Sequence, residues 1–293
     1  LVLIGMIATT YTFVNRVATN NDLDISAVEE EVQVVEEEGT IEDTTTTSTT
    51  TTTLPEEVIT YLEEIQGEKV QSDELGQTVL EANDNWDDRE TLYTELGVFS
   101  DFKPILSKSN KSRSHIFLAN IHPDLQKLVI EQNENNDAII VVDTMNLWID
   151  IAKDSLLDVL SNSNILLLNE SEAYMLTDCD TLSDSASSIL DMGLDYVVIK
   201  KGSSGLELFS PKNHISIEAY PVKEVVDPTG AGDTFGGGFI SALASGKSKT
   251  DSLIYGSSLA SICVEGFGPE AILNASEEDI NHRINYLKSK LNS

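Results

Sequence analysis

Short apolar runs alternate with helix-like segments from about residue 91 onward, and this alternation most constrains the fold. The apolar runs lack the polar alternation of a half-exposed strand, and the segments between them show helical spacing of apolar residues. Strands buried on both faces and separated by helices predict a mostly parallel sheet covered on both sides, an α/β fold. The predicted strands are residues 115–121, 138–144, 164–170, 195–202 and 205–210. The clearest predicted helices are residues 123–133, 153–163 and 183–193.

Polar residues stand at or near the ends of these predicted strands. Ligands of parallel sheets bind beyond the carboxyl ends of the strands, so several polar residues there predict a binding site. Any one of them has an alternative interpretation as a cap of the next helix. The residues are Asn120, Asp143, Asn169, Lys200 and Gly202.

The most glycine-rich stretch is VVDPTGAGDTFGGGF, residues 225–239. We expect a strand over 222–226 before it and a helix over 232–246 after it. A strand-to-helix turn of this kind presents backbone N–H groups at a helix N-terminus, which bind an anion without any basic side chain. No lysine follows the glycines, so the stretch is not a P-loop. It lies after most of the strands and carries Asp233, which also argues against a dinucleotide-binding fingerprint and an NAD(P)-binding protein.

Charge and composition exclude several classes of protein. The formal net charge of -32 argues against nucleic acid or an anionic membrane surface as a partner. The two cysteines, Cys179 and Cys263, form no CxxC pair, so a disulfide scaffold or zinc ribbon is excluded. The four histidines are scattered, so no histidine metal site is predicted.

The first 90 residues differ from the rest, because they hold 22 of the 50 acidic residues and 3 of the 18 basic ones. Residues 1–19 form an apolar segment with two open interpretations: the remnant of a membrane anchor, or a buried strand or helix. Residues 20–55 are acidic and then threonine-rich, which predicts a disordered linker. Residues 56–90 are unassigned, with a short amphipathic helix expected at their start.

Several ordered motifs resemble the pfkB, or ribokinase-like, family of sugar and nucleoside kinases. They are DPTGAGDTFGGGF, LLLNESEAYML, VVIKKGSSGLELF and SICVEGFGPEAI, and the resemblance covers about residues 88–293. LYTELGVFSDFKP, FLANIHPDLQ and VVDTMNLWI are similar to a bacterial branch of the family. The resemblance implies a ribokinase-like three-layer fold over residues 91–293. It also implies ATP-dependent phosphorylation of a hydroxyl of a small sugar or nucleoside.

The resemblance assigns the catalytic roles to the glycine-rich loop. Asp233 would be the general base, kept ionised by the helix dipole. Gly230, Ala231 and Gly232 would donate N–H groups to the transferring phosphoryl group. The alternatives are an N-terminal cap for Asp233 and a tight turn for the glycines. Gly236, Gly237 and Gly238 lie inside the predicted helix, where they would permit close approach of a nucleotide or of a neighbouring element.

The resemblance also implies nucleotide and Mg²⁺ sites. Lys200, Gly202 and Gly205 would lie beside the nucleotide. Asn169 and Glu172 form the NxxE motif, in which Glu172 would hold Mg²⁺ through water. The same spacing is that of a capping box, and both interpretations can hold together.

A monovalent-cation site, for K⁺, would include Asp227 and Thr229, although Asp227 alone could brace the loop. Asp143 and Asn146 face the same cleft without a defined role.

The family pattern begins abruptly, and residues 1–90 contain no GG pair. We therefore expect the first strands of the sheet and the lid to be missing or replaced, and we predict no substrate-binding residues. The alternative function is a catalytically inactive remnant that binds nucleotide but no sugar. ATP chemistry places the kinase domain in the cytoplasm, with membrane attachment through residues 1–16 if they form an anchor.

Overall fold

The computed structural model describes residues 102–268 and 270–291 in full, together with the backbone of four earlier strands. The chain divides into two compact units. The first comprises Leu1–Ala8 and Phe102–Ser293, and the second comprises Thr9–Asp101. The predicted linker at 20–55 and the helix expected at the start of 56–90 lie outside the described residues.

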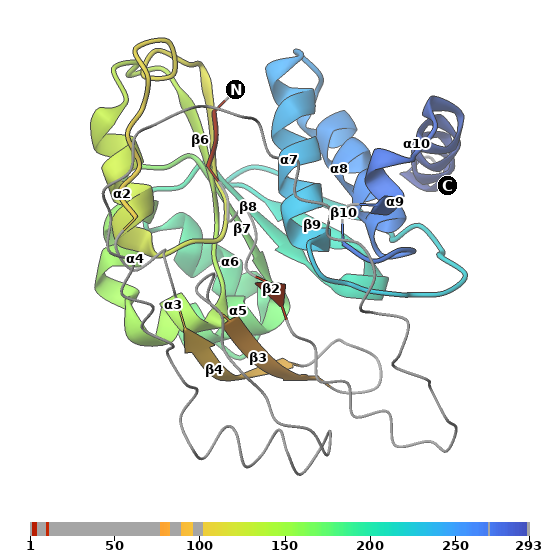
Figure 1. The fold of residues 1–293 in the computed structure, drawn as a ribbon, viewed down its shortest axis with the longest axis horizontal. Coiled ribbons are helices and arrows are strands. Elements are labelled where there is room, and N and C mark those ends of the chain that lie inside the picture. The colour runs from red at the N-terminus through yellow and green to blue at the C-terminus, as the bar shows by residue number, and fades with distance from the viewer. Residues whose placement is uncertain are drawn as a thin grey trace, which may run out of the picture. The chain divides into compact units, whose positions relative to one another are not determined.

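The first unit is built on a seven-stranded sheet in the order β1-β5-β6-β7-β8-β9-β10 (Figure 1). Strands β1 to β8 in this order are parallel, and β9 and β10 are antiparallel additions at one edge. The predicted mostly parallel sheet is confirmed. The strands are β1 (Val2–Ile4), β5 (His115–Leu118), β6 (Ile139–Asp143), β7 (Ile165–Asn169), β8 (Tyr196–Lys200), β9 (Leu206–Phe209) and β10 (His214–Ile217).

Helices α2 to α6 lie between the strands in sequence, and helices α7 to α10 come after the last strand. Proline at the first position of α2 and positive φ angles at Gly193 and Gly246 mark helix boundaries where the sequence predicts them. The helices are α2 (Pro123–Gln132), α3 (Asn146–Ile151), α4 (Lys153–Leu160), α5 (Glu170–Thr177), α6 (Leu182–Leu190), α7 (Ala231–Ala244), α8 (Lys249–Cys263), α9 (Glu270–Leu273) and α10 (Glu277–Leu291), with a 3₁₀ turn at Gly202–Ser204.

Two apolar cores lie on opposite faces of the sheet, which makes the fold three-layered. Along β5, Ile116 and Leu118 join one core, and Phe117 between them joins the other. The first core packs against α2 to α6, and the second against α7, α8 and α10. This is the predicted α/β architecture, and it places helix α7 on the second face of the sheet.

Four short strands lie in the N-terminal part of the chain. Val2–Ile4 is a strand that pairs in parallel with β5, and a strand is one of the two interpretations that the sequence leaves open for residues 1–19. The sequence leaves residues 56–90 unassigned, and within them Gln77–Ala82 (β3) and the start of Arg89–Glu95 (β4) are strands. With β2 (Thr10–Tyr11) they form a separate three-stranded sheet in the second unit.

No helix in the described part of the chain is both long and apolar enough to cross a membrane.

The strand expected at 222–226 is absent, and the segment is an irregular connection. Its last residues pair with a helix end instead of a sheet edge: the N–H groups of Val226 and Asp227 donate to the carbonyl oxygen of Val264 at 2.7 and 3.3 Å. Val264 is the C-cap of α8, so the connection satisfies a carbonyl that the helix leaves unpaired. The β-branched residues of this segment favour a strand locally, and this tertiary contact overrides them.

Arg283 of α10 also contacts the end of α8, close to Val264. Its guanidinium donates to the hydroxyl of Ser261 at 3.1 Å and pairs with the carboxylates of Glu265 and Asp279. The residue is 6% exposed, so its charge is buried but fully paired. Arg283 thereby joins α10 to the end of α8.

Two of the three glycines inside α7 permit close packing with neighbouring elements. A side chain at Gly236 would overlap the buried ring of Phe117 on β5. One at Gly238 would lie 2.9 Å from Leu259 Cδ1 and 3.1 Å from the backbone of Gly256 on α8. A side chain at Gly237 would meet nothing within 4 Å. The glycines at 236 and 238 therefore serve helix packing.

These contacts predict opposite effects for two neighbouring alanine substitutions. Gly236→Ala should destabilise the fold by about 1–3 kcal/mol, because Phe117 is only 1% exposed and has no room to move. Gly237→Ala should be neutral or stabilising by up to roughly 1 kcal/mol, because alanine favours the helix and the space is open. Urea unfolding of both variants measures the difference. Equal destabilisation by the two would contradict this packing, and Phe117→Leu should partly rescue Gly236→Ala.

Candidate functional site

The carboxyl ends of three adjacent strands bring the predicted residues together. Asp143, Asn169 and Lys200 are the last residues of β6, β7 and β8. In the register of the sheet, Asp143 is opposite Leu167 and Asn169 is opposite Lys200. Residues distant in sequence therefore meet at one edge, as the strand-end pattern predicts.

Lys200 and Asp143 form a close ion pair at this edge. Lys200 Nζ lies 2.8 Å from Asp143 Oδ1, with side-chain exposures of 21% and 5%. Burial disfavours the charged lysine, but the carboxylates of Asp143, Glu172 and Asp233 outweigh it and raise the pKa of Lys200. A charged ammonium group therefore stands among three acidic side chains. Motif comparison gave Asp143 no role and did not predict the pair, which spans 57 residues.

The first turn of α7 lies directly beside this ion pair. A Cβ atom added at Gly232 would be 3.2 Å from Lys200 Nζ and 3.7 Å from Asp143 Oδ2. The N-cap, Gly230, has φ of 75°, a left-handed conformation that glycine adopts without strain. A larger residue at 232 would come between the helix and the lysine.

We expected the N–H groups of Gly230, Ala231 and Gly232 to be available for the phosphoryl group, but one of them is not. Ala231 N–H already donates to the carbonyl oxygen of Pro228 at 3.2 Å, so it serves the turn. Within the described residues, the N–H groups of Gly232 and Asp233 have no hydrogen-bond partner, as is usual at a helix start. Together with Lys200 they can bind an anion.

Asp233 is the third residue of α7. Part of the residue is open to solvent, whereas neighbouring protein atoms crowd its carboxyl group. Loss of hydration around its carboxyl group, reinforced by the charge of Asp143, raises its pKa to about 6, against the opposing effect of Lys200. We expected the helix dipole to keep Asp233 firmly ionised. Instead, its surroundings give it a pKa near neutrality, which suits a group that accepts and releases protons.

Asn169 and Glu172 form the capping box that their spacing allows. Asn169 Oδ1 accepts from Glu172 N–H, and Glu172 Oε2 accepts from Asn169 N–H, both at 2.8 Å. No cluster of three or more acidic, histidine or cysteine side chains suited to a metal ion occurs among the described residues. The single carboxylate of Glu172 beside the amide of Asn169 fits a Mg²⁺ ion that is held mainly through water. It does not fit a Mg²⁺ ion that is enclosed by protein ligands alone.

The loop before α7 contains Asp227 and Thr229. Asp227 Oδ1 accepts from Thr229 N–H at 2.8 Å, which is the bracing role left open by the sequence. Thr229 Oγ1 is buried without a hydrogen-bond partner. An orphaned hydroxyl beside a buried carboxylate is chemically suited to a monovalent cation, so the residues present fit K⁺.

Gly202 and Gly205 form the tight turn between β8 and β9. Both have positive φ angles, and a side chain at Gly205 would overlap the carbonyl oxygen of Ile217 on β10. The turn therefore has a packing reason for glycine at 205.

Asn120, another of the predicted strand-end residues, has a local structural role. Its Oδ1 accepts a hydrogen bond from Trp148 Nε1 at 2.8 Å, which fixes α3. Asn146 is the first residue of α3, and within the described part of the chain it forms no hydrogen bond or ion pair with the residues of the site.

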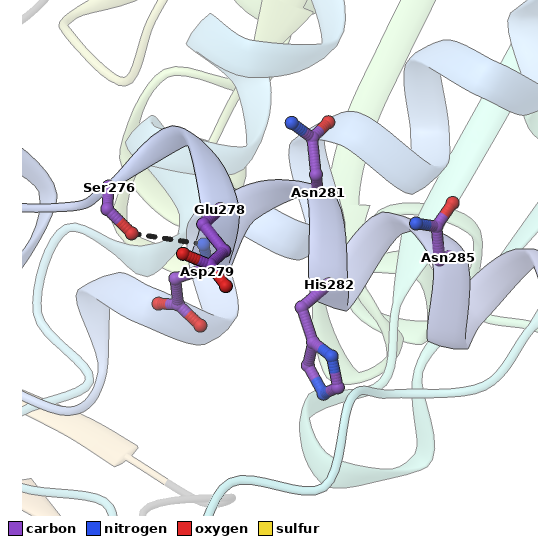
Figure 2. A pocket seen from close by; sticks show the side chains of 6 residues that line it. All are labelled: Ser276, Glu278, Asp279, Asn281, His282 and Asn285. Atoms are coloured by element: carbon purple, nitrogen blue, oxygen red, sulfur yellow. Dashed lines mark hydrogen bonds between the residues drawn. The ribbon is translucent and has the colours of Figure 1, made fainter.

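A second polar feature lies on α10 and is separate from this site. It is a hollow open to solvent, and Figure 2 shows its polar side chains, with Asp279 N–H donating to Ser276 Oγ at 3.1 Å. None of its lining residues belongs to the predicted site. They are Ser276, Glu278, Asp279, Asn281, His282 and Asn285.

Comparison with known proteins matches the chain to the pfkB family of carbohydrate kinases over residues 67–275. The match begins before the expected residue 88 and ends before α10. Among the relatives, a cytidine kinase of Thermococcus kodakarensis is 35% identical over 97 residues, covering 32% of this chain and 34% of that protein. A ribokinase of Arabidopsis thaliana is 35% identical over 114 residues, covering 37% and 30%. The chain thus spans about a third of the length of these relatives.

Solved structures show the same fold. An Escherichia coli protein assigned as ribokinase II, in complex with ATP and Mg²⁺, superposes with a TM-score of 0.60 at 24% identity, covering 72% of this chain and 71% of that one. Arabidopsis thaliana ribokinase with ribose and ATP gives 0.57 at 22%, covering 71% and 69%. The ribokinase-like fold and the match over most of the described residues lead to one assignment: the chain belongs to the pfkB family of carbohydrate kinases.

Proposed function

We propose that this chain transfers the γ-phosphoryl group of ATP to a hydroxyl of a small sugar or nucleoside. The observation that carries the proposal is the grouping of a carboxylate with a near-neutral pKa, two free N–H groups and a lysine at the first turn of α7. Family membership and the ATP and ribose bound to structural relatives support it.

Asp233 acts as the general base in this proposal. It accepts the proton of the attacking hydroxyl as the oxygen bonds to the γ-phosphorus and the bond to the β-phosphate oxygen breaks. With its pKa at about 6, the carboxylate is mostly ionised at pH 7. It then returns the proton to solvent.

The first turn of α7 and Lys200 stabilise the charge on the transferring group. The N–H groups of Gly232 and Asp233 donate to its oxygens, and the Lys200 ammonium neutralises part of the negative charge. In this proposal Gly202, Gly205 and Asn169 lie beside the bound nucleotide. Gly230 and Ala231 shape the turn that exposes the donors.

The metal ions have supporting roles here. Glu172 would hold Mg²⁺ through water, and bound Mg²⁺ would shield the phosphate charge. Asp227 and Thr229 would hold K⁺ behind the loop, where it would fix the first turn of α7. A nucleotide-binding remnant without turnover remains the alternative, which the first experiment below separates.

Asp233→Asn should lower kcat by about 10²–10⁴-fold with an ATP and sugar panel, because the base is lost. ATP binding measured by calorimetry should persist, since the N–H groups and Lys200 remain. If Asp233→Asn keeps full turnover, Asp233 is not the base. If the wild-type protein binds ATP but phosphorylates no sugar or nucleoside, the chain is the inactive remnant.

Asp251→Asn is the matched control for this variant. Asp251 is also the third residue of a helix, α8, where Ser248 caps it and Lys288 pairs with it. Its replacement removes a carboxylate from an equivalent helical position away from the site. Turnover should stay at the wild-type level.

The raised pKa of Asp233 predicts the pH dependence of turnover. The base works when deprotonated, so kcat/KM should be flat above pH 7 and fall about tenfold per pH unit below about 6. An ordinary aspartate would delay this fall to below about pH 4. A profile that stays flat down to pH 5 would contradict the assignment.

A further inference from the structure

We infer that Asp143 is a positioning residue for phosphoryl transfer, because its carboxylate fixes the Lys200 ammonium beside the N-terminus of α7. The inference rests on the proposed function and deepens it. It assigns a role to a buried acid that the family motifs leave without one.

Asp143 is itself held rigidly at the end of β6. Its backbone carbonyl oxygen accepts from Gln126 Nε2 at 3.0 Å, and the same Gln126 nitrogen donates to Ala119 at the end of β5. Its Oδ1 accepts from Thr144 N–H at 3.2 Å as well as from Lys200. The carboxylate is therefore a fixed point at the sheet edge.

Lys200 needs such a fixed point. Its side chain is a flexible four-carbon stem that carries considerable rotamer entropy, and it leaves the last residue of β8. The 2.8 Å pair with Asp143 selects one position for Nζ, next to Gly232. The cation thus stands beside the free N–H groups before any nucleotide binds.

Electrostatics argue that Asp143 is present for position and not for affinity. Asp143, Glu172 and Asp233 all surround the single lysine charge, so the site already carries excess negative charge. Another carboxylate repels phosphate and weakens binding of ATP. A residue that opposes binding while ordering a cation should act mainly on kcat.

The test is a double-mutant cycle between Asp143→Asn and Lys200→Gln. Asp143→Asn keeps an oxygen that can accept the existing hydrogen bonds but loses the charge. It should lower kcat by about 10- to 100-fold while the KM for ATP stays equal or falls. In the Lys200→Gln background, the same substitution should change kcat less than about threefold, because the cation it positions is gone.

Asp143→Glu separates position from charge and guards against a folding defect in Asp143→Asn. The longer side chain keeps the negative charge and displaces the ammonium group. It should lower kcat with Lys200 present and have little effect with Lys200→Gln. Thermal unfolding of each variant checks that it is folded.

Glu207→Gln is the matched control. Glu207 Oε1 pairs with Lys201 Nζ at 2.7 Å, and Lys201 is the residue that directly follows β8 and Lys200. This ion pair resembles the first, but neither of its residues has a role in the proposed reaction, so its loss should leave kcat and KM unchanged.

The outcomes distinguish the inference from the proposed function. Equal losses from Asp143→Asn with and without Lys200, in an active wild-type protein, overturn the positioning role and leave the kinase function standing. A rise in KM alone does the same. A wild-type protein that neither binds ATP nor phosphorylates a sugar overturns the proposed function and the positioning role with it.

Discussion

The contact of Gly236 with the ring of Phe117 determines where α7 lies, and the site depends on it. Because Gly236 has no side chain, the helix packs directly on β5, and Gly238 lets α8 approach from the other side. This packing holds the first turn of α7 over the ends of β6 and β8, where Asp143 and Lys200 pair. The core thus fixes the geometry of the polar edge, and a packing residue is as necessary to the site as a charged one.

Much of the fold could be predicted because its signals are local. Unbroken apolar runs such as residues 165–168 of β7 identify buried parallel strands, and the proline and glycine boundaries of helices act within a few residues. The prediction of a strand at 222–226 was wrong because Val226, at its end, donates its N–H to Val264 at the end of α8, a partner about 40 residues away in the chain. The sequence of β3, QTVLEA, carries too weak an alternation to identify a strand, and the sequence therefore leaves it unassigned.

The candidate site divides in the same way. The capping box of Asn169 and Glu172 follows from their spacing, and the anion-binding turn follows from its glycines. The Asp143–Lys200 pair could not be predicted, because it joins two strand ends through the order of strands in the sheet. The pKa of Asp233 also reversed an expectation. The helix dipole is a local effect that the sequence shows, whereas the hydration of Asp233 and the charge of Asp143 depend on the complete fold.

The contact of Arg283 with the end of α8 can form only late in the synthesis of the chain. Arg283 binds Glu265 next to Val264, whose carbonyl oxygen holds the connection that leads into the loop before α7. Leu287, on the same helix, completes the second core. A nascent chain therefore carries all residues of the anion-binding turn before it can brace them. Helix α10 lies after the end of the family match, and it must leave the ribosome before Arg283 can stabilise the loop.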